Sequence, residues 1–128
     1  MSLFYLQNQA NLWRKLFGVQ SDNHESSDQC SLQLALINEE HEEVVQAYRQ
    51  YKQSDTSTHA LLLKELGDLV FVCYQAAENM GWDLDEAMQR IFLSNISKLG
   101  EDSRPIRDDR GKILKGPNYQ PPDLSDLV

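Results

Sequence analysis

The chain of 128 residues has little of what several large classes of protein depend on. Its two cysteines, Cys30 and Cys73, lie far apart and form no CxxC pattern, so neither a disulfide framework nor a zinc site is indicated. No apolar run approaches the roughly 18 residues that a membrane span requires. The N-terminus lacks the basic region and the cleavage site of a secretory signal. We therefore expect a cytoplasmic protein with no membrane partner.

Basic residues are also scarce. Lysine and arginine number 12 against 20 acidic residues, which gives a net charge of −8. This balance argues against binding to a nucleic-acid polymer or an anionic membrane. It leaves a nucleotide substrate open, because bound cations would invert the local field. The length indicates one domain, residues 1–128, and a chain of this size often gains stability by forming oligomers.

Apolar residues recur at helical spacing in four segments, which are residues 3–17, 30–52, 58–80 and 84–99. The sequence therefore predicts an all-α, four-helix bundle-like core over residues 3–99. The third segment is apolar on most sides, so we expect it to be the buried element. Gly67 lies in its middle and costs about 1 kcal/mol relative to alanine. Close approach of a neighbouring helix is a reason for a glycine there.

The segment 100–128 has a different character, with Gly, Pro, Asp and Arg but no helical period. Pro121 and Pro122 favour an extended path. Apolar residues such as Ile113 and Leu114 have little reason to occur in a solvated tail. We therefore expect an extended but structured tail that folds over the bundle or over a neighbouring subunit.

Acidic residues lie on the apolar faces of the second and third predicted helices. Glu40 and Glu43 share a face with Leu36, and Glu65 and Asp68 share a face with neighbouring leucine and valine residues. Carboxylates at i and i+3 point the same way along a helix. Two such pairs on packed helices would bring four carboxylates to one point.

Four converging carboxylates repel one another. Burying them unpaired would cost several kcal/mol each, or would force some of them to take up protons. A divalent cation removes both problems, and hard oxygen ligands in this number suit Mg²⁺ or Mn²⁺ rather than zinc. The alternative is a non-catalytic helical interaction module whose acids are surface charges.

The acidic pattern resembles that of a known family. Glu39-Glu40-x-x-Glu43, followed after 21 intervening residues by Glu65-x-x-Asp68, is similar to the EExxE…ExxD signature of the MazG-like, all-α nucleoside triphosphate pyrophosphohydrolases. Asn95-x-x-Lys98 and the segment 111–124 extend the resemblance, which covers roughly residues 31–124. It implies a MazG-type core. The short chain and its largely apolar third helix separately predict assembly as a homodimer or homotetramer, because neighbouring helices cannot cover all of that apolar surface. The resemblance also implies metal-dependent hydrolysis of a (deoxy)nucleoside triphosphate at the α–β bond, giving the monophosphate and pyrophosphate.

The resemblance assigns roles to individual residues. It implies two or three Mg²⁺ or Mn²⁺ ions, which would be held by Glu40, Glu43, Glu65 and Asp68. Glu39 would orient or deprotonate the attacking water, or hold an additional ion. The predicted substrate-binding residues are Asn95 and Lys98 on the phosphates, Lys112 and Lys115 on the outer phosphates, Tyr119 on the base or sugar, and Trp13. Trp13 is interpreted either as packing with Phe17 or as the wall of a base pocket.

The preferred base remains open at this point. Trp13 and Trp82 offer wide stacking surfaces, which favour a purine such as dGTP or GTP. Relatives that act on dUTP or dCTP give one alternative, and a phosphoribosyl-ATP pyrophosphohydrolase of histidine synthesis gives another. The long tail and the first helix fit the general nucleotide group better.

Overall fold

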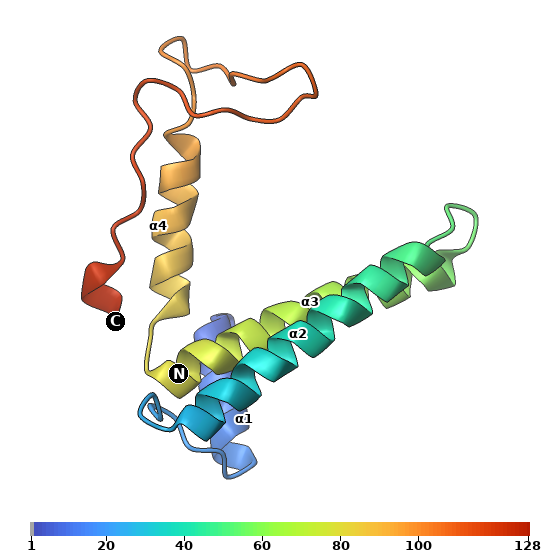
Figure 1. The fold of residues 1–128 in the computed structure, drawn as a ribbon, viewed down its shortest axis with the longest axis vertical. Helices are drawn as coiled ribbons and strands as arrows, with labels where there is room; N and C mark the ends of the chain where they lie inside the picture. The colour runs from blue at the N-terminus through green and yellow to red at the C-terminus, as the bar shows by residue number, and fades with distance from the viewer. Residues whose placement is uncertain (1) are drawn as a thin grey trace. The chain divides into compact units, whose positions relative to one another are not determined.

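A computed structural model describes residues 2–128. Its elements are the four α-helices α1 (Leu6–Leu16), α2 (Ser27–Gln50), α3 (Thr56–Met80) and α4 (Leu84–Ile96), and the 3₁₀ helix η1 (Ser125–Leu127) (Figure 1). Within these described residues there is no strand, only an isolated antiparallel bridge between Arg107 and Ile113. The predicted all-α class is therefore confirmed. None of the helices between residues 2 and 128 has the length and apolar character needed to cross a membrane.

The chain forms two compact units, Met1–Asp83 and Leu84–Val128. This division falls before α4, whereas the sequence changes its character at residue 100. The first unit therefore contains α1, α2 and α3, and the second contains α4 and the tail.

In the first unit, α2 and α3 form an antiparallel pair whose helices lie side by side (Figure 1). Each helix begins at a side chain that caps it. Ser26 accepts a hydrogen bond from the backbone N–H of Gln29 at 3.3 Å, and Asp55 accepts one from the N–H of Ser57 at 3.0 Å. These caps satisfy amides that the helix leaves unpaired. Both helices consequently begin before the predicted starts at residues 30 and 58.

One face of α3 packs against α2. Its buried residues on that face include Glu65, Val72, Gln75 and Asn79, which are seven, three and four positions apart, as residues on one helical face are. The Asn79 amide donates to Cys30 Sγ at 3.7 Å, which places the end of α3 beside the start of α2. This antiparallel register brings the acids of the two helices to the same level.

The opposite face of α3 is open to solvent. Leu63, Leu66 and Val70 are 72%, 45% and 46% exposed. The prediction that α3 is buried on most sides is therefore correct only for the sides that face α1 and α2. A Cβ atom added at Gly67 would meet nothing within 4 Å among the described residues. The predicted close helix approach at Gly67 is therefore wrong within this chain.

Helix α1 packs on α3 through a buried arginine. Arg14 is 1% exposed, and its guanidinium donates to Gln75 Oε1 at 3.2 Å, to Asn79 Oδ1 at 3.3 Å and to the carbonyl of Gln20. The Trp13 ring stacks on Phe17 with centroids 4.6 Å apart. The predicted packing of these two aromatic rings is thus present.

In the second unit, α4 ends at Ile96 rather than at the predicted residue 99. The N–H groups of Lys98 and Leu99 bond only three residues back, at 3.3 and 3.2 Å, which tightens the chain out of α-helical geometry. The N–H of Gly116 donates to the carbonyl of Lys98 at 2.9 Å. Lys98 therefore follows the helix instead of sharing a helical face with Asn95.

The tail returns along α4. Ser94 Oγ donates to the carbonyl of Gln120 at 2.7 Å. Arg90 forms ion pairs with Glu86 at 3.0 Å and with Asp126 at 2.6 Å, and donates to the carbonyl of Asp123. A structured tail was predicted, and these contacts give it a partner in α4 of the same chain.

Candidate metal centre and adjoining cavity

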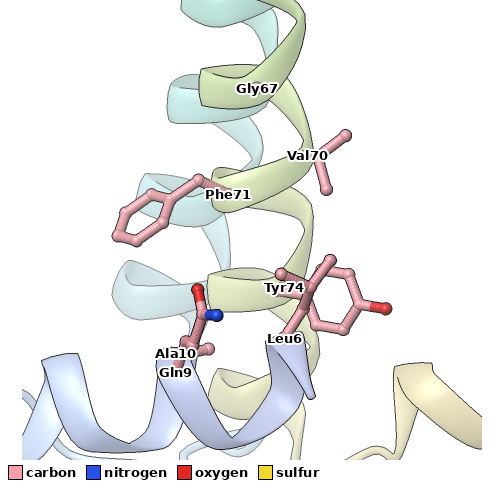
Figure 2. Close-up of a pocket in the computed structure, with 7 residues that line it drawn as sticks. All are labelled: Leu6, Gln9, Ala10, Gly67, Val70, Phe71 and Tyr74. Atoms are coloured by element: carbon pink, nitrogen blue, oxygen red, sulfur yellow. The ribbon is translucent and has the colours of Figure 1, made fainter. Parts of the chain in front are cut away.

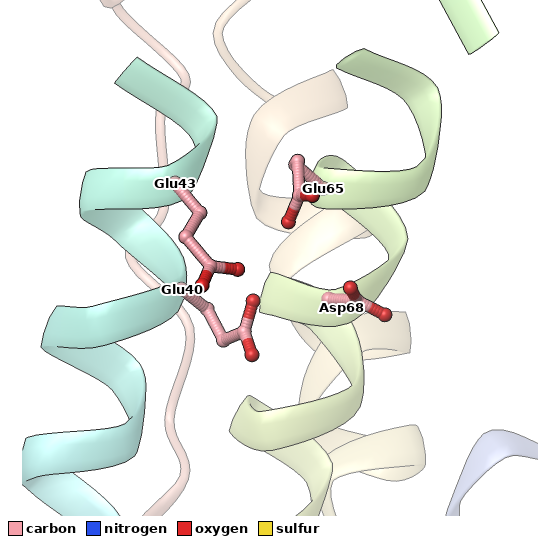
Figure 3. Close-up of side chains that lie close together, drawn as sticks. All are labelled: Glu40, Glu43, Glu65 and Asp68. Atoms are coloured by element: carbon pink, nitrogen blue, oxygen red, sulfur yellow. The ribbon is translucent and has the colours of Figure 1, made fainter. Parts of the chain in front are cut away.

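Four carboxylates converge between α2 and α3. Glu40 and Glu43 project from α2 toward α3, where Glu65 extends toward them and Asp68 lies one turn further along (Figure 3). One oxygen from each residue lies within 4.8 Å of the others. The sequence predicted this convergence from the i, i+3 spacing of the two pairs, and the structure brings all four residues together.

The carboxylates are partly desolvated. Glu65 is 7% exposed, and the Oε2 atoms of Glu40 and Glu65 are buried with no hydrogen-bond partner among the described residues. Burial is the largest cause that raises the pKa of Glu40 to about 7, followed by its hydrogen bond with Glu43 and the charges of Glu43, Asp68 and Glu65. Near neutral pH, Glu40 therefore retains part of its proton when no cation is bound.

Lys64 supplies a positive charge that the sequence reasoning missed. Its Nζ lies 2.9 Å from Asp68 Oδ2 and 3.3 Å from Glu65 Oε1. The hydrogen bond with Asp68, and then that with Glu65, raises the pKa of Lys64 above its usual range. The i, i+4 spacing of Lys64 and Asp68 was the available signal. The Lys64 side chain is 63% exposed, so these pairs contribute little to stability.

The donor set fits a divalent cation. All four side chains offer carboxylate oxygens, the ligands of hard cations such as Mg²⁺ and Mn²⁺. The unpartnered oxygens of Glu40 and Glu65 lack the hydrogen bonds that buried carboxylates normally have. A bound cation would give these oxygens a partner and remove the repulsion among the four charges.

Glu39 lies on α2 but is exposed, and it is not among the four clustered acids. Its predicted role toward the attacking water stays a prediction. Glu42 is also exposed, as expected of a residue on a solvated face.

The other predicted substrate-binding residues, apart from Trp13, belong to the second unit. Asn95, Lys112 and Lys115 are exposed, whereas Lys98 and Tyr119 are half-buried. Lys115 Nζ lies 4.8 Å from the centre of the Tyr119 ring, within cation–π range. Their contacts with a nucleotide stay predictions.

A cavity of about 390 Å³ adjoins the acidic cluster. Its lining includes Glu40 and Asp68 together with the aromatic side chains of Trp13 and Phe71, whose ring centroids are 5.7 Å apart. The rest of the lining is Arg14, Val19, Gln29, Leu32, Gln33, Leu36, Val72 and Gln75. The volume is typical of a small-molecule site. Trp13 therefore stands at the wall of a cavity beside the acids, as one of its two interpretations requires.

Trp82 does not share this cavity. It lines a different hollow in the first unit, together with residues such as Asp22 and Glu78. The preference for a purine relied on both tryptophans, and only Trp13 is placed to stack with a base in the cavity beside the acids.

A second hollow, of about 290 Å³, lies where α1 meets α3 (Figure 2). It is lined by Leu6, Gln9, Ala10, Gly67, Val70, Phe71 and Tyr74. It has no acidic residue in its lining, so it is an apolar surface feature and not part of the metal centre.

A comparison with known protein families shows which family the chain belongs to. Residues 17–95 match the family model described as phosphoribosyl-ATP pyrophosphohydrolase. The chain belongs to this family. The family lies within the MazG-like all-α nucleoside triphosphate pyrophosphohydrolases, and membership implies a pyrophosphohydrolase that acts on a nucleotide. The match includes all four clustered acids and ends at Asn95. No curated protein matches the chain.

Proposed function

We propose that the protein is a metal-dependent hydrolase that cleaves the α–β bond of a (deoxy)nucleoside triphosphate and releases pyrophosphate. The observation that carries this proposal is the four-carboxylate cluster, in which Glu40 and Glu65 each have a buried oxygen that no group in residues 2–128 hydrogen-bonds. The adjoining cavity is large enough to take part of a nucleotide. Family membership supports the same reaction class.

In this proposal Glu40, Glu43, Glu65 and Asp68 hold two or three Mg²⁺ or Mn²⁺ ions. Such ions neutralise phosphate oxygens and lower the pKa of a bound water. To hold these ions, Glu40 would have to give up its proton, and Lys64 would have to release its ion pairs with Asp68 and Glu65. Glu39 would orient or deprotonate the attacking water, or hold an additional ion.

The remaining predicted residues bind the substrate. Asn95 and Lys98 contact the phosphates, and Lys112 and Lys115 contact the outer phosphates. Tyr119 covers the base or the sugar, and Trp13 provides a stacking surface. Arginine and lysine side chains and amides are the donors that such phosphate contacts require.

The cavity favours an ordinary nucleoside triphosphate, with dGTP or GTP as the first expectation and dUTP or dCTP as the alternative. The family description favours phosphoribosyl-ATP as a second candidate. That substrate carries an additional phosphate on its second ribose. Arg14 supplies the positive charge in the cavity lining, and its terminal nitrogens are already engaged by Gln20, Gln75 and Asn79. Only the Nε of Arg14 lacks a partner among the described residues, so an additional phosphate would find a single free N–H of this guanidinium in the lining.

A nucleotide screen with separate readouts for pyrophosphate and phosphate tests the proposal. The panel contains dGTP, GTP, dATP, dCTP, dUTP and phosphoribosyl-ATP, each with Mg²⁺ and with Mn²⁺. We expect pyrophosphate without phosphate, and no turnover after chelation. Release of phosphate from the γ position, or no turnover of any compound, would contradict the proposal. An interaction module would, in addition, show no rise in melting temperature on addition of Mn²⁺.

A further inference from the structure

The cavity beside the acids contains two buried amide side chains that the proposed reaction does not use. Gln33 on α2 is 6% exposed and Gln75 on α3 is 3% exposed. Both line the cavity. Gln33 Oε1 and Gln75 Nε2 are buried without a hydrogen-bond partner among the described residues. A buried polar atom left unpaired costs about 1–3 kcal/mol, so these two atoms indicate a ligand that satisfies them.

The hydrogen bond from Arg14 fixes which way the Gln75 amide faces. A guanidinium has donors only, so the group that it contacts at 3.2 Å has to be the amide oxygen of Gln75. The Nε2 of Gln75 is therefore the atom left as a free donor. Gln33 contributes a free acceptor through Oε1. The two amides thus offer the cavity one acceptor from α2 and one donor from α3, beside the Arg14 Nε and the Glu40 Oε2, which also lack a partner among the described residues.

The two amides stand at the same level of the α2–α3 pair. Gln33 lies seven residues before Glu40, and Gln75 lies seven residues after Asp68. Because the helices are antiparallel, both steps run in the same direction, over roughly 10 Å of helix. The acids occupy one end of this span and the amides the other, with the rings of Trp13 and Phe71 also in the lining.

This arrangement suits a nucleotide held by its two ends. The phosphates would lie at the acidic end, and the span corresponds to a sugar and a base. Each nucleobase carries hydrogen-bond donors and acceptors on its edge, which amide side chains can read. Aromatic rings offer the base an apolar surface.

We propose that this cavity binds the nucleobase and that Gln33 and Gln75 are specificity-determining residues, with Gln33 as acceptor and Gln75 as donor. The inference rests on the proposed function, because it requires the phosphates at the acidic cluster. It adds two residues that neither the acidic signature nor the resemblance assigns.

Two substitutions separate base recognition from a structural role. Gln33→Met removes the free acceptor while keeping the length and burial of the side chain. Gln75→Glu keeps an oxygen for Arg14 and replaces the free donor by an acceptor. Gln50→Met is the matched control, because Gln50 is an exposed residue of α2 that does not line the cavity.

The experiment measures pyrophosphate release from dGTP, dATP, dCTP and dUTP, and inhibition by inorganic tripolyphosphate, which has no base. We expect Gln33→Met to raise KM for the preferred nucleotide on the order of tenfold, the effect of one buried hydrogen bond. Gln75→Glu should change the ranking of the bases by kcat/KM. The inhibition constant of tripolyphosphate and the melting temperature of Gln33→Met should match those of the wild type.

Unchanged KM values and an unchanged ranking in both variants would overturn the inference, as would an equal loss of affinity for tripolyphosphate. If Gln75→Glu does not fold, Gln33→Met decides alone, since the Oε1 that it removes has no hydrogen-bond partner among the described residues. A wild-type protein that releases no pyrophosphate from any nucleotide would refute the proposed function. An active wild type with unaltered variants would refute only the role of the two glutamines.

Discussion

At the scale of single residues, Glu40 determines much of the electrostatics of the acidic cluster. Its carboxyl lies among Glu43, Glu65 and Asp68, and one of its oxygens is buried without a hydrogen-bond partner in the part of the chain that the structure describes. We expect Glu40→Gln to reduce turnover by a factor on the order of 100 or more, since even partners outside the ligand set cost 10–100-fold. Steady-state pyrophosphate release at saturating Mg²⁺ measures this. Near-wild-type activity would show that Glu40 is not a ligand.

The same substitution should not destabilise the metal-free protein. Glutamine resembles the protonated form of Glu40 and removes one of four mutually repelling charges. The melting temperature in metal-free buffer should therefore stay the same or rise. Glu42→Gln is the control, because Glu42 is exposed on the same helix and lies outside the cluster.

The raised pKa of Glu40 predicts a pH dependence of stability. Between its ordinary value of 4.5 and about 7, the folded protein holds a proton on Glu40 that the unfolded chain has released. Stability without metal should therefore fall as the pH rises through this window, and change little above it on this account. Thermal melts in metal-free buffer check this, and Glu40→Gln should weaken the slope. A wild-type melting temperature that rises steadily from pH 4.5 to 7 would contradict the assignment.

The four clustered acids were predictable because their i, i+3 spacing on apolar helix faces can be read directly from the amino-acid sequence. Lys64, Gln33 and Gln75 were not identified. A glutamine next to leucine residues looks like an ordinary polar position of an amphipathic helix, and only the register of α2 against α3 shows that both amides line one cavity. The buried Arg14 likewise depends on where α1 crosses α3.

At the scale of elements, the four helices were predictable from their period and several of their ends were not. The starts of α2 and α3 depend on Ser26 and Asp55, which cap the two helices. Both capping residues precede the first residue of the apolar pattern. The end of α4 depends on a tertiary contact, the bond from Gly116 to the carbonyl of Lys98. A Cβ atom at Gly116 would lie 2.5 Å from the carbonyl oxygen of Leu99, so this contact requires glycine.

Removal of the tail tests its role. Truncation after Arg110 deletes the partners of α4, including Gly116, Gln120 and Asp126. We expect lower activity, because Lys112, Lys115 and Tyr119 are lost and the chain around Lys98 loses its support. The helical content measured by circular dichroism should remain largely intact, because α1, α2 and α3 form a separate compact unit. A fully active truncated protein would show that the tail takes no part in the site.

At the scale of the whole molecule, several large apolar side chains are exposed in the single chain, and exposed apolar patches commonly mark interaction surfaces. Leu63, Leu66 and Val70 form an exposed stripe on α3, and Phe92 and Leu93 of α4 are 61% and 65% exposed. The sequence showed the surplus of apolar residues on α3 but not which side would remain uncovered. A closed homo-oligomer is the usual way to bury such surfaces, and we propose a dimer or tetramer that covers the α3 stripe.

Leu66→Glu tests this assembly. A charge in the middle of the stripe would be desolvated on association, so the variant should shift toward the monomer in light scattering at micromolar concentration. Its circular dichroism spectrum should match that of the wild type, because Leu66 is 45% exposed in the single chain. A wild-type monomer, or a variant with the wild-type mass, would rule out this interface.

The central claim is hydrolysis at the α-phosphorus by a metal-loaded carboxylate cluster, and the position of an oxygen label tests it most directly. The reaction is run with the best nucleotide and Mg²⁺ in water enriched in ¹⁸O, and both products are analysed by mass spectrometry. Attack of water on the α-phosphorus places one ¹⁸O in the nucleoside monophosphate and none in the pyrophosphate. Label found in the pyrophosphate would mean attack on the β-phosphorus and would contradict the account.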